Sequence, residues 1–183
     1  MAAQGLSGFY GSVFKRSTVA FVLIRTSDWR ILTLRTGAGD WEFPGGVVKG
    51  SEDPRSAARR MAREALGFQF DVGRLLVMDC VQGNAGQGDS IAFVFDGGTL
   101  ATSVTGFTGA GGEREARFFP VGECPDVLGG SSAVRLGAAL EALELGTMTE
   151  LVNGRQVSGE PLAPPASQRM MPPVDGFSGV LGR

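Results

Sequence analysis

The stretch WEFPGGVVKGSEDPRSAARRMAREALGF, residues Trp41–Phe68, leads from an extended segment through a glycine-rich turn into a helix. Residues 41–43 are predicted to be extended, and the Pro-Gly-Gly run at 44–46 is predicted to break the chain. Asp53 is a favourable N-cap, because its side chain accepts hydrogen bonds from free backbone N–H groups, and Pro54 suits the first helical position. These signals place the start of a helix at Pro54.

The predicted helix covers Pro54–Leu66 and stops at Gly67, since glycine readily adopts the left-handed conformation that closes a helix. Its apolar side chains recur at intervals of three and four residues, which places them on one face. This wide stripe, expected to face the core, consists of Ala57, Ala58, Met61, Ala62, Ala65 and Leu66.

The segments around this helix predict an α+β fold with a mixed β-sheet. Ser17–Thr26 is apolar and rich in β-branched residues, as is typical of a buried strand, and Arg30–Thr36 follows as the second arm of a hairpin. The remaining predictions are strands at Arg74–Gln82, Ser90–Asp96 and Arg114–Phe119, an amphipathic helix at Ser131–Leu145 with Val134, Ala138, Leu140 and Leu145 near one side, and a hairpin at Thr147–Val157 around Asn153-Gly154. Strands and helices do not alternate regularly, which argues against a Rossmann fold.

The length of 183 residues is typical of one domain. We expect a loose lead-in over residues 1–16, a folded domain over 17–157, and a flexible tail over 158–183, where Pro, Ser and Gly dominate. The N-terminal residues lack the apolar run of a signal peptide, and no stretch is long enough to span a membrane. Cys80 and Cys124 are expected to be free thiols, Cys80 as a buried apolar residue, so a cytoplasmic location is expected.

The composition excludes several chemistries. The chain has no histidine, so a Ser-His-Asp or Cys-His nucleophile and a His-ligated metal site are impossible. Acid–base work falls to carboxylates, lysine, tyrosine, cysteine or a metal-bound water. The net charge of −2 gives no general attraction to nucleic acid, and no stripe of basic and aromatic residues is visible.

Residues 46–68 resemble the Nudix box, whose pattern is G-x5-E-x7-R-E-U-x-E-E-x-G-U, with U a bulky apolar residue. The resemblance also includes the opening hairpin and the segment Glu115–Pro125, and it covers about residues 17–157. It implies a Nudix-like α/β/α sandwich with a mixed β-sheet, and a hydrolase of nucleoside diphosphates linked to another moiety. The matching positions of the box are Gly46, Glu52, Arg60, Ala62, Glu64, Gly67 and Phe68.

Two departures from the box concern the metal. Met61 and Ala65 stand where the family has glutamates, so Glu64 alone remains of the three helix carboxylates. Residues at i, i+3 and i+4 share a helix face, where three carboxylates would converge on Mg²⁺. Mg²⁺ or Mn²⁺ is therefore expected to bind weakly, through Glu64, Glu52, the Gly46 carbonyl and substrate phosphates, or not at all.

Other carboxylates are candidates to replace the missing ligands or to act as the base. Glu113 and Glu115 are the first choices, because in related folds a carboxylate late in the sheet region has this role. Asp79 and Asp89 are the alternatives.

The resemblance assigns roles to the residues that remain. Glu64 is the candidate ligand or base, Glu52 orients the loop or helps to bind metal, and Arg60 is expected to pair with Glu52 or Glu64. Candidates for contact with the substrate are Arg35, Lys49, Trp41 and Met61, although each is also compatible with a surface or packing role.

Three functions stay open from the sequence. The first is hydrolysis of a nucleoside diphosphate conjugate with impaired or atypical metal dependence. The second is a repurposed biosynthetic enzyme that uses Glu64 without metal, and the third is a non-hydrolytic protein that binds a ligand or a partner. The expected substrate is a small phosphorylated molecule recognised outside the box, through residues 100–112 or the tail. Homodimerisation is left open.

Overall fold

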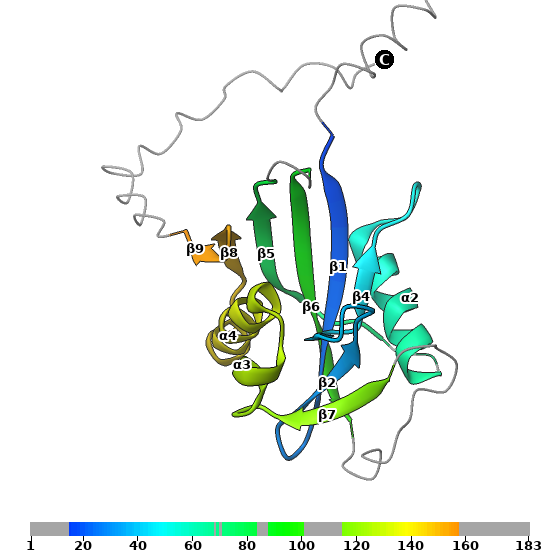
Figure 1. Cartoon of the computed structure of the whole chain (residues 1–183), viewed down its shortest axis with the longest axis vertical. Coiled ribbons are helices and arrows are strands. Elements are labelled where there is room, and N and C mark those ends of the chain that lie inside the picture. The colour runs from blue at the N-terminus through cyan, green and yellow to red at the C-terminus, as the bar shows by residue number, and fades with distance from the viewer. Residues whose placement is uncertain (1–14, 68, 70, 84–87, 101–114, 158–183) are drawn as a thin grey trace, which may run out of the picture.

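The computed structural model describes residues 15–67, 69, 71–83, 88–100 and 115–157 (Figure 1). The predicted tail at 158–183 and most of the lead-in at 1–16 lie outside these residues. So do Phe68, Glu113 and nearly all of the segment 100–112.

Within the described residues the strands form one nine-stranded mixed sheet, with helices on both of its faces (Figure 1). The strand order is β3-β2-β1-β6-β5-β8-β9, with β4 paired to β1 and β7 paired to β2. The strands are β1 (Ser17–Thr26), β2 (Arg30–Arg35), β3 (Trp41–Glu42), β4 (Gly45–Val47), β5 (Leu75–Val81), β6 (Ser90–Leu100), β7 (Ala116–Pro120), β8 (Thr149–Val152) and β9 (Arg155–Gln156). The helices are α2 (Pro54–Leu66), α3 (Cys124–Val127) and α4 (Gly130–Leu145).

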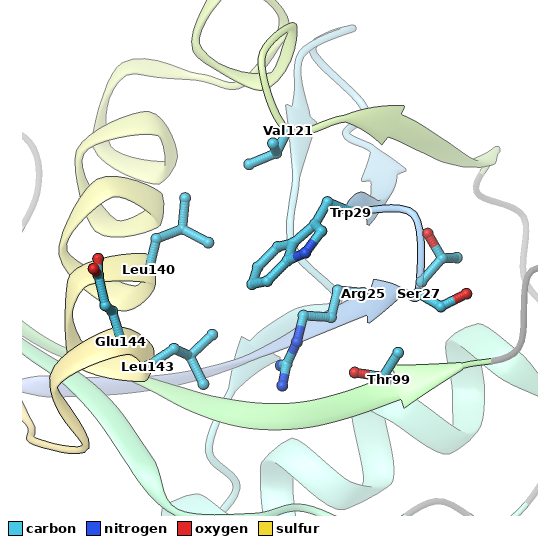
Figure 2. A pocket seen from close by; sticks show the side chains of 9 residues that line it. Arg25, Ser27, Trp29, Thr99, Val121, Leu140, Leu143 and Glu144 are labelled. Carbon is cyan, nitrogen blue, oxygen red and sulfur yellow. The ribbon is translucent and has the colours of Figure 1, made fainter.

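The pairing confirms the α+β class and the mixed sheet. β1 runs parallel to β6 and antiparallel to β2 and β4, while β5 runs parallel to β8. The predicted turns are also present. Asn153 and Gly154 between β8 and β9 both have positive φ, at 51° and 73°, as a type I′ turn requires. The β1–β2 turn carries Trp29 toward α4 (Figure 2).

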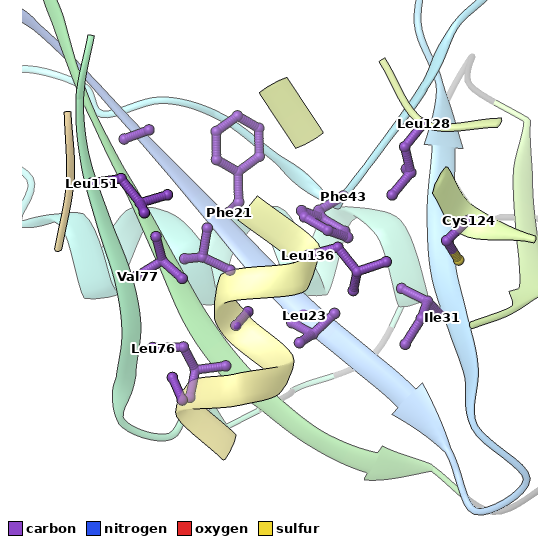
Figure 3. Close-up of a cluster of buried hydrophobic side chains, with 14 of the residues drawn as sticks. Phe21, Leu23, Ile31, Phe43, Leu76, Val77, Cys124, Leu128, Leu136 and Leu151 are labelled. Carbon is purple, nitrogen blue, oxygen red and sulfur yellow. The ribbon is translucent and has the colours of Figure 1, made fainter. Parts of the chain in front are cut away.

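The core lies on both faces of β1, which explains its nearly continuous apolar sequence. Phe21 and Leu23 face α4 and join one buried cluster (Figure 3). Ala20, Val22 and Ile24 point the other way and pack with the alanines of α2. Alternate residues of one strand thus serve two layers, and β1 holds α2 and α4 on opposite sides of the sheet.

The caps of α2 lie where the sequence predicts them. The Asp53 carboxylate accepts a hydrogen bond from the Ser56 N–H at 3.0 Å, and Gly67 closes the helix with φ 76° and a bond to the Arg63 carbonyl. The predicted apolar face is confirmed, except that Met61 is only partly buried. The small buried side chains let the helix approach the sheet closely.

The prediction that residues 44–46 break the chain is wrong, because Gly45–Val47 forms β4. Its antiparallel register aligns Gly45 with Phe21 and Gly46 with Ala20. A Cβ on Gly45 would lie 2.2 Å from the Phe21 ring and 2.7 Å from the Ala20 carbonyl. The glycine therefore allows a close strand approach rather than a chain break, a role that depends on the neighbouring strand.

The predicted face of the second helix also needs correction. Val134 and Leu145 are 45% and 62% exposed in α4. The helix instead buries Ser132, Arg135, Leu136, Ala139 and Ala142. Arg135 can face inward because it meets the buried carboxylate of Asp79, a pairing that local periodicity does not reveal.

The structure adds three details to the sequence analysis. The short helix α3 was not predicted. Cys80 is partly exposed rather than buried, whereas Cys124 is buried. Among the described residues, no helix is both long and apolar enough to cross a membrane.

Candidate active site

The candidate site is formed by β4, the loop that follows it, and the first three turns of α2. A Cβ on Gly46 would lie 2.8 Å from the terminal methyl group of Met61, so β4 packs directly against the helix at this point. Glu52 lies in the loop and Arg60, Met61 and Glu64 lie on α2. Residues from two elements thus meet around one short strand.

Glu52 and Arg60 form the central ion pair. Arg60 Nε donates to Glu52 Oε1 and Arg60 Nη2 donates to Glu52 Oε2, each at 2.9 Å. The Lys49 backbone N–H donates to Glu52 Oε2 at 3.1 Å, and Arg60 Nη2 also donates to the Val47 carbonyl at 3.3 Å. The pair therefore joins the loop and β4 to α2.

This environment stabilises the charged forms of both residues. The hydrogen bonds from Arg60 lower the pKa of Glu52 from 4.5 to about 2, even though desolvation acts in the opposite direction. The same contact with Glu52 raises the pKa of Arg60 above its ordinary value. Glu52 is anionic at neutral pH, and its carboxylate oxygens are already engaged.

Glu64 has a different environment. Its side chain is 56% exposed, and among the described residues its ion pair is with Arg60, whose Nη1 donates to Glu64 Oε1 at 3.4 Å. Arg60 Nη1 also lies 3.5 Å from the Met61 sulfur. Arg60 thus contacts both carboxylates, and Glu64 is the one open to solvent and solutes.

The residues present do not fit a divalent cation of the kind that the box implies. Ala65 is 6% exposed and has no donor atom, and Met61 offers a thioether, which is a poor ligand for Mg²⁺. Glu52 is held by Arg60. Across the part of the chain that the structure describes, no three Asp, Glu or Cys side chains converge on a position that suits a metal ion.

The alternative carboxylates are held elsewhere. Asp79 is buried on the α4 side, where it pairs with Arg135 at 2.9 Å. Asp89 pairs with Arg16 at 3.4 Å and accepts the Gly83 N–H. Glu115 pairs with Arg35 at 3.1 Å, with both side chains 53% exposed. Glu113 lies outside the described residues.

The candidates for substrate contact fall into two groups. Met61 lies within the site, and Lys49 contributes its backbone N–H to Glu52 while its side chain is exposed. Arg35 and Trp41 form the other group on β2 and β3, where the guanidinium carbon lies 5.9 Å from the ring centroid. Trp41 also meets Phe119 edge to face at 5.0 Å. Among the described residues, no hydrogen bond, ion pair or ring contact joins the two groups.

Two members of the ion-pair network, the Lys49 N–H and the Val47 carbonyl, are not predicted by the sequence. Both are backbone groups, so no side-chain pattern could have identified them. They become partners of Glu52 and Arg60 because β4 pairs with β1 and brings the loop over the helix.

Comparisons with known proteins bear on the family and on the overall fold of the chain. A family model described as the NUDIX domain matches residues 14–134. A CMP-5'-(N-acetyl-N-hydroxy-3-aminopropyl)phosphonate hydrolase from Streptomyces rubellomurinus is 35% identical over 106 residues, which are 56% of this chain and 48% of that protein. The chain thus matches about half the length of this relative.

Two solved structures resemble the fold. A MutT protein from Methanosarcina mazei has a TM-score of 0.56 at 20% identity, over 73% of this chain and 96% of its own. An ADP-ribose pyrophosphatase from Streptococcus suis has a TM-score of 0.55 at 18% identity, over 75% and 99% of the two chains.

Proposed function

Because this chain belongs to the Nudix hydrolase superfamily, we propose that it hydrolyses a nucleoside diphosphate linked to another moiety, with weakened dependence on a divalent cation. The observation that carries the proposal is the pairing of a solvent-accessible Glu64 with an Arg60 that is fixed by Glu52. The proposed catalytic unit lies within residues 17–157.

The similarity to the phosphonate hydrolase supports a conjugate of a nucleotide as the substrate class. That relative is named for a CMP-linked phosphonate. A small, phosphorylated substrate with a nucleotide part is consistent with this likeness and with the exposed Arg35 and Lys49. The identity of the second moiety is expected to depend on residues outside the box.

The proposed chemistry assigns proton transfer to Glu64. Its carboxylate accepts a proton from a water molecule whose oxygen forms the new bond to phosphorus, and the bridging oxygen leaves with the electrons of the broken P–O bond. Arg60 positions Glu64, while Glu52 holds Arg60. Any Mg²⁺ or Mn²⁺ would depend mainly on the substrate phosphates, since the protein supplies so few ligands.

The decisive variant is Glu64→Gln, which keeps the shape of the side chain and removes its basicity. Release of a nucleoside monophosphate from a panel of nucleoside diphosphate conjugates should fall by about 10²-fold or more. Glu141→Gln, an exposed glutamate of α4, is the matched control and should leave turnover unchanged. Equal turnover in both variants would contradict the role of Glu64.

Calorimetric titration with Mg²⁺ and Mn²⁺ tests the metal part separately. We expect both cations to bind the free protein weakly. If turnover persists in the presence of a chelator, the protein is a metal-independent enzyme of the repurposed kind. Tight binding that Glu64→Gln abolishes would instead indicate a conventional metal site.

A second candidate is a protein that binds a nucleotide conjugate without hydrolysing it. Met61 and Ala65 favour it, because neither side chain can supply the missing carboxylates. Saturable binding of a conjugate, with no product at any metal concentration, would support this alternative and exclude hydrolysis.

A further inference from the structure

A cavity lies between the β1–β2 turn and α4 (Figure 2), on the face of the sheet that α4 covers, whereas α2 with Glu64 packs on the other face. Its volume of about 620 Å³ is within the range of small-molecule sites. Trp29 reaches into it from the turn, and α4 supplies Leu140, Leu143 and Glu144 (Figure 2). The lining is mainly apolar, with charged side chains at defined positions.

Trp29 has an unfavourable backbone conformation for a bulky residue. Its φ is +58°, in the left-handed region where glycine or asparagine is preferred. The turn holds it there, because its N–H donates to the Thr26 carbonyl at 3.1 Å and its carbonyl accepts the Val121 N–H at 2.9 Å. The residue is still 50% exposed. A strained and half-exposed tryptophan that faces a cavity indicates a role for its ring beyond packing.

The charges around the cavity favour a cation. Arg25 lies 5.8 Å from the Trp29 ring, but its charge is matched by Asp96 at 2.7 Å, with both side chains largely buried. Glu144 is exposed, and no described side chain forms an ion pair with it. Among the described residues that line the cavity, Glu144 is thus the one acidic side chain without an ion-pair partner, and Trp29 is the one aromatic side chain.

We propose that this cavity binds a small organic cation, a protonated amine attached to a flat apolar body. The body packs against Trp29, Leu140 and Leu143. The ammonium group is attracted to the Glu144 carboxylate. This site is separate from the proposed active site, and its ligand is independent of the nucleotide conjugate.

The test uses 2-phenylethylammonium as the probe, with 3-phenylpropionate and 2-phenylethanol as anionic and neutral analogues. The full chain has two tryptophans, so two indole N–H signals are expected in a nitrogen-correlated NMR spectrum. The Trp29 signal is assigned by its loss in Trp29→Asn. The Trp29 signal should shift and saturate as the cation is added, while the Trp41 signal stays in place. Each analogue should bind at least about fivefold more weakly than the cation.

Two variants separate binding from folding. Measured by calorimetry, probe binding should be abolished in Trp29→Asn, and the unfolding midpoint should not fall, because asparagine accepts the left-handed conformation. Glu144→Gln should weaken the cation about fivefold and leave the neutral analogue unaffected. Three results would each overturn the proposal. They are equal affinity for the cation and the anion, a Trp29 signal that does not move at the highest probe concentration, and a Trp29→Asn variant that is unfolded.

Discussion

Glu52 and Glu64 are both carboxylates of the same box, yet their surroundings separate their roles. Glu52 accepts hydrogen bonds from Arg60 and from the Lys49 backbone, and its side chain is 18% exposed. Glu64 is 56% exposed, and among the described residues it forms an ion pair with Arg60, at the edge of hydrogen-bond distance. Glu52 joins the loop to the helix, and Glu64 is the carboxylate that solvent reaches.

The lowered pKa of Glu52 predicts a pH dependence of stability. A carboxyl group whose pKa is lower in the folded state stabilises the fold above its unfolded value and loses that contribution on acidification. The stabilisation should be complete above about pH 4.5 and disappear toward about pH 2. In thermal unfolding, Glu52→Gln should lower the midpoint at neutral pH, and its difference from the wild type should shrink across this interval.

Glu115→Gln is the control for that measurement. Its partner Arg35 is 53% exposed, and such pairs contribute little. If both variants show the same pH profile, the bidentate contact with Arg60 is not the cause.

Restoring one lost carboxylate should restore metal affinity. Met61 is partly buried beside Gly46 and precedes Glu64 by three residues, so a glutamate there shares the helix face of Glu64. Met61→Glu should increase Mg²⁺ affinity about tenfold or more in calorimetry. Met61→Gln, which has the same length without the charge, should leave affinity unchanged. Equal Mg²⁺ affinities of Met61→Glu and Met61→Gln would show that the site lacks room for the ion.

At the scale of elements, α2 is specified locally and α4 by its neighbours. Both ends of α2 carry strong signals in the Asp53 cap and in Gly67 with its left-handed φ. α4 begins after Gly129 without a side-chain cap, and it owes its orientation to contacts with the sheet. This difference explains why the buried face was predicted correctly for one helix only.

The same substitution should have opposite effects in the two helices. Gly67→Ala places a Cβ at φ 76° and should destabilise the protein by about 1 kcal/mol. Gly137→Ala lies within α4, where an added Cβ meets open space, and should stabilise by about 0.5–1 kcal/mol. Chemical denaturation measures both. A loss of stability in Gly137→Ala would show that α4 has an unseen steric limit.

At the scale of the whole molecule, one buried ion pair connects three elements. Arg135 on α4 donates to Asp79 on β5 at 2.9 Å, and the other Asp79 oxygen accepts the N–H of Gly154 in the β8–β9 turn at 3.1 Å. Asp79 and Arg135 are only 1% and 6% exposed. The pair thus fixes the α4 layer and the last hairpin to the sheet.

Removing one partner should therefore destabilise the fold strongly. Arg135→Leu leaves the Asp79 charge buried without its partner and should lower the free energy of unfolding by about 3 kcal/mol. Arg35→Leu, which removes the exposed ion pair with Glu115, should change the free energy of unfolding by less than about 1 kcal/mol. Adding Asp79→Asn to Arg135→Leu should recover part of the loss. If stability does not recover in the double variant, the loss comes from packing and not from the buried charge.

The sequence by itself determined most of the elements, though not β4 or α3, and it determined the identity of the box. Local residue preferences predict the bounds of β1 and α2, the caps of α2 and the turn at Asn153-Gly154. The spacing of the residues identifies the box, through Gly46, Glu52, Arg60 and Glu64. Local signals suffice here because caps, turns and periodicity act within a few residues.

Only the tertiary structure decided which polar groups meet. Contacts between distant segments explain why Gly45 and Gly46 form a strand and why the Arg135 side chain is buried. They also bring Arg60 to Glu52. The cavity beside Trp29 also forms only where the β1–β2 turn approaches α4. Burial and charge pairing are set by neighbours in space, and the order of residues along the chain does not specify them.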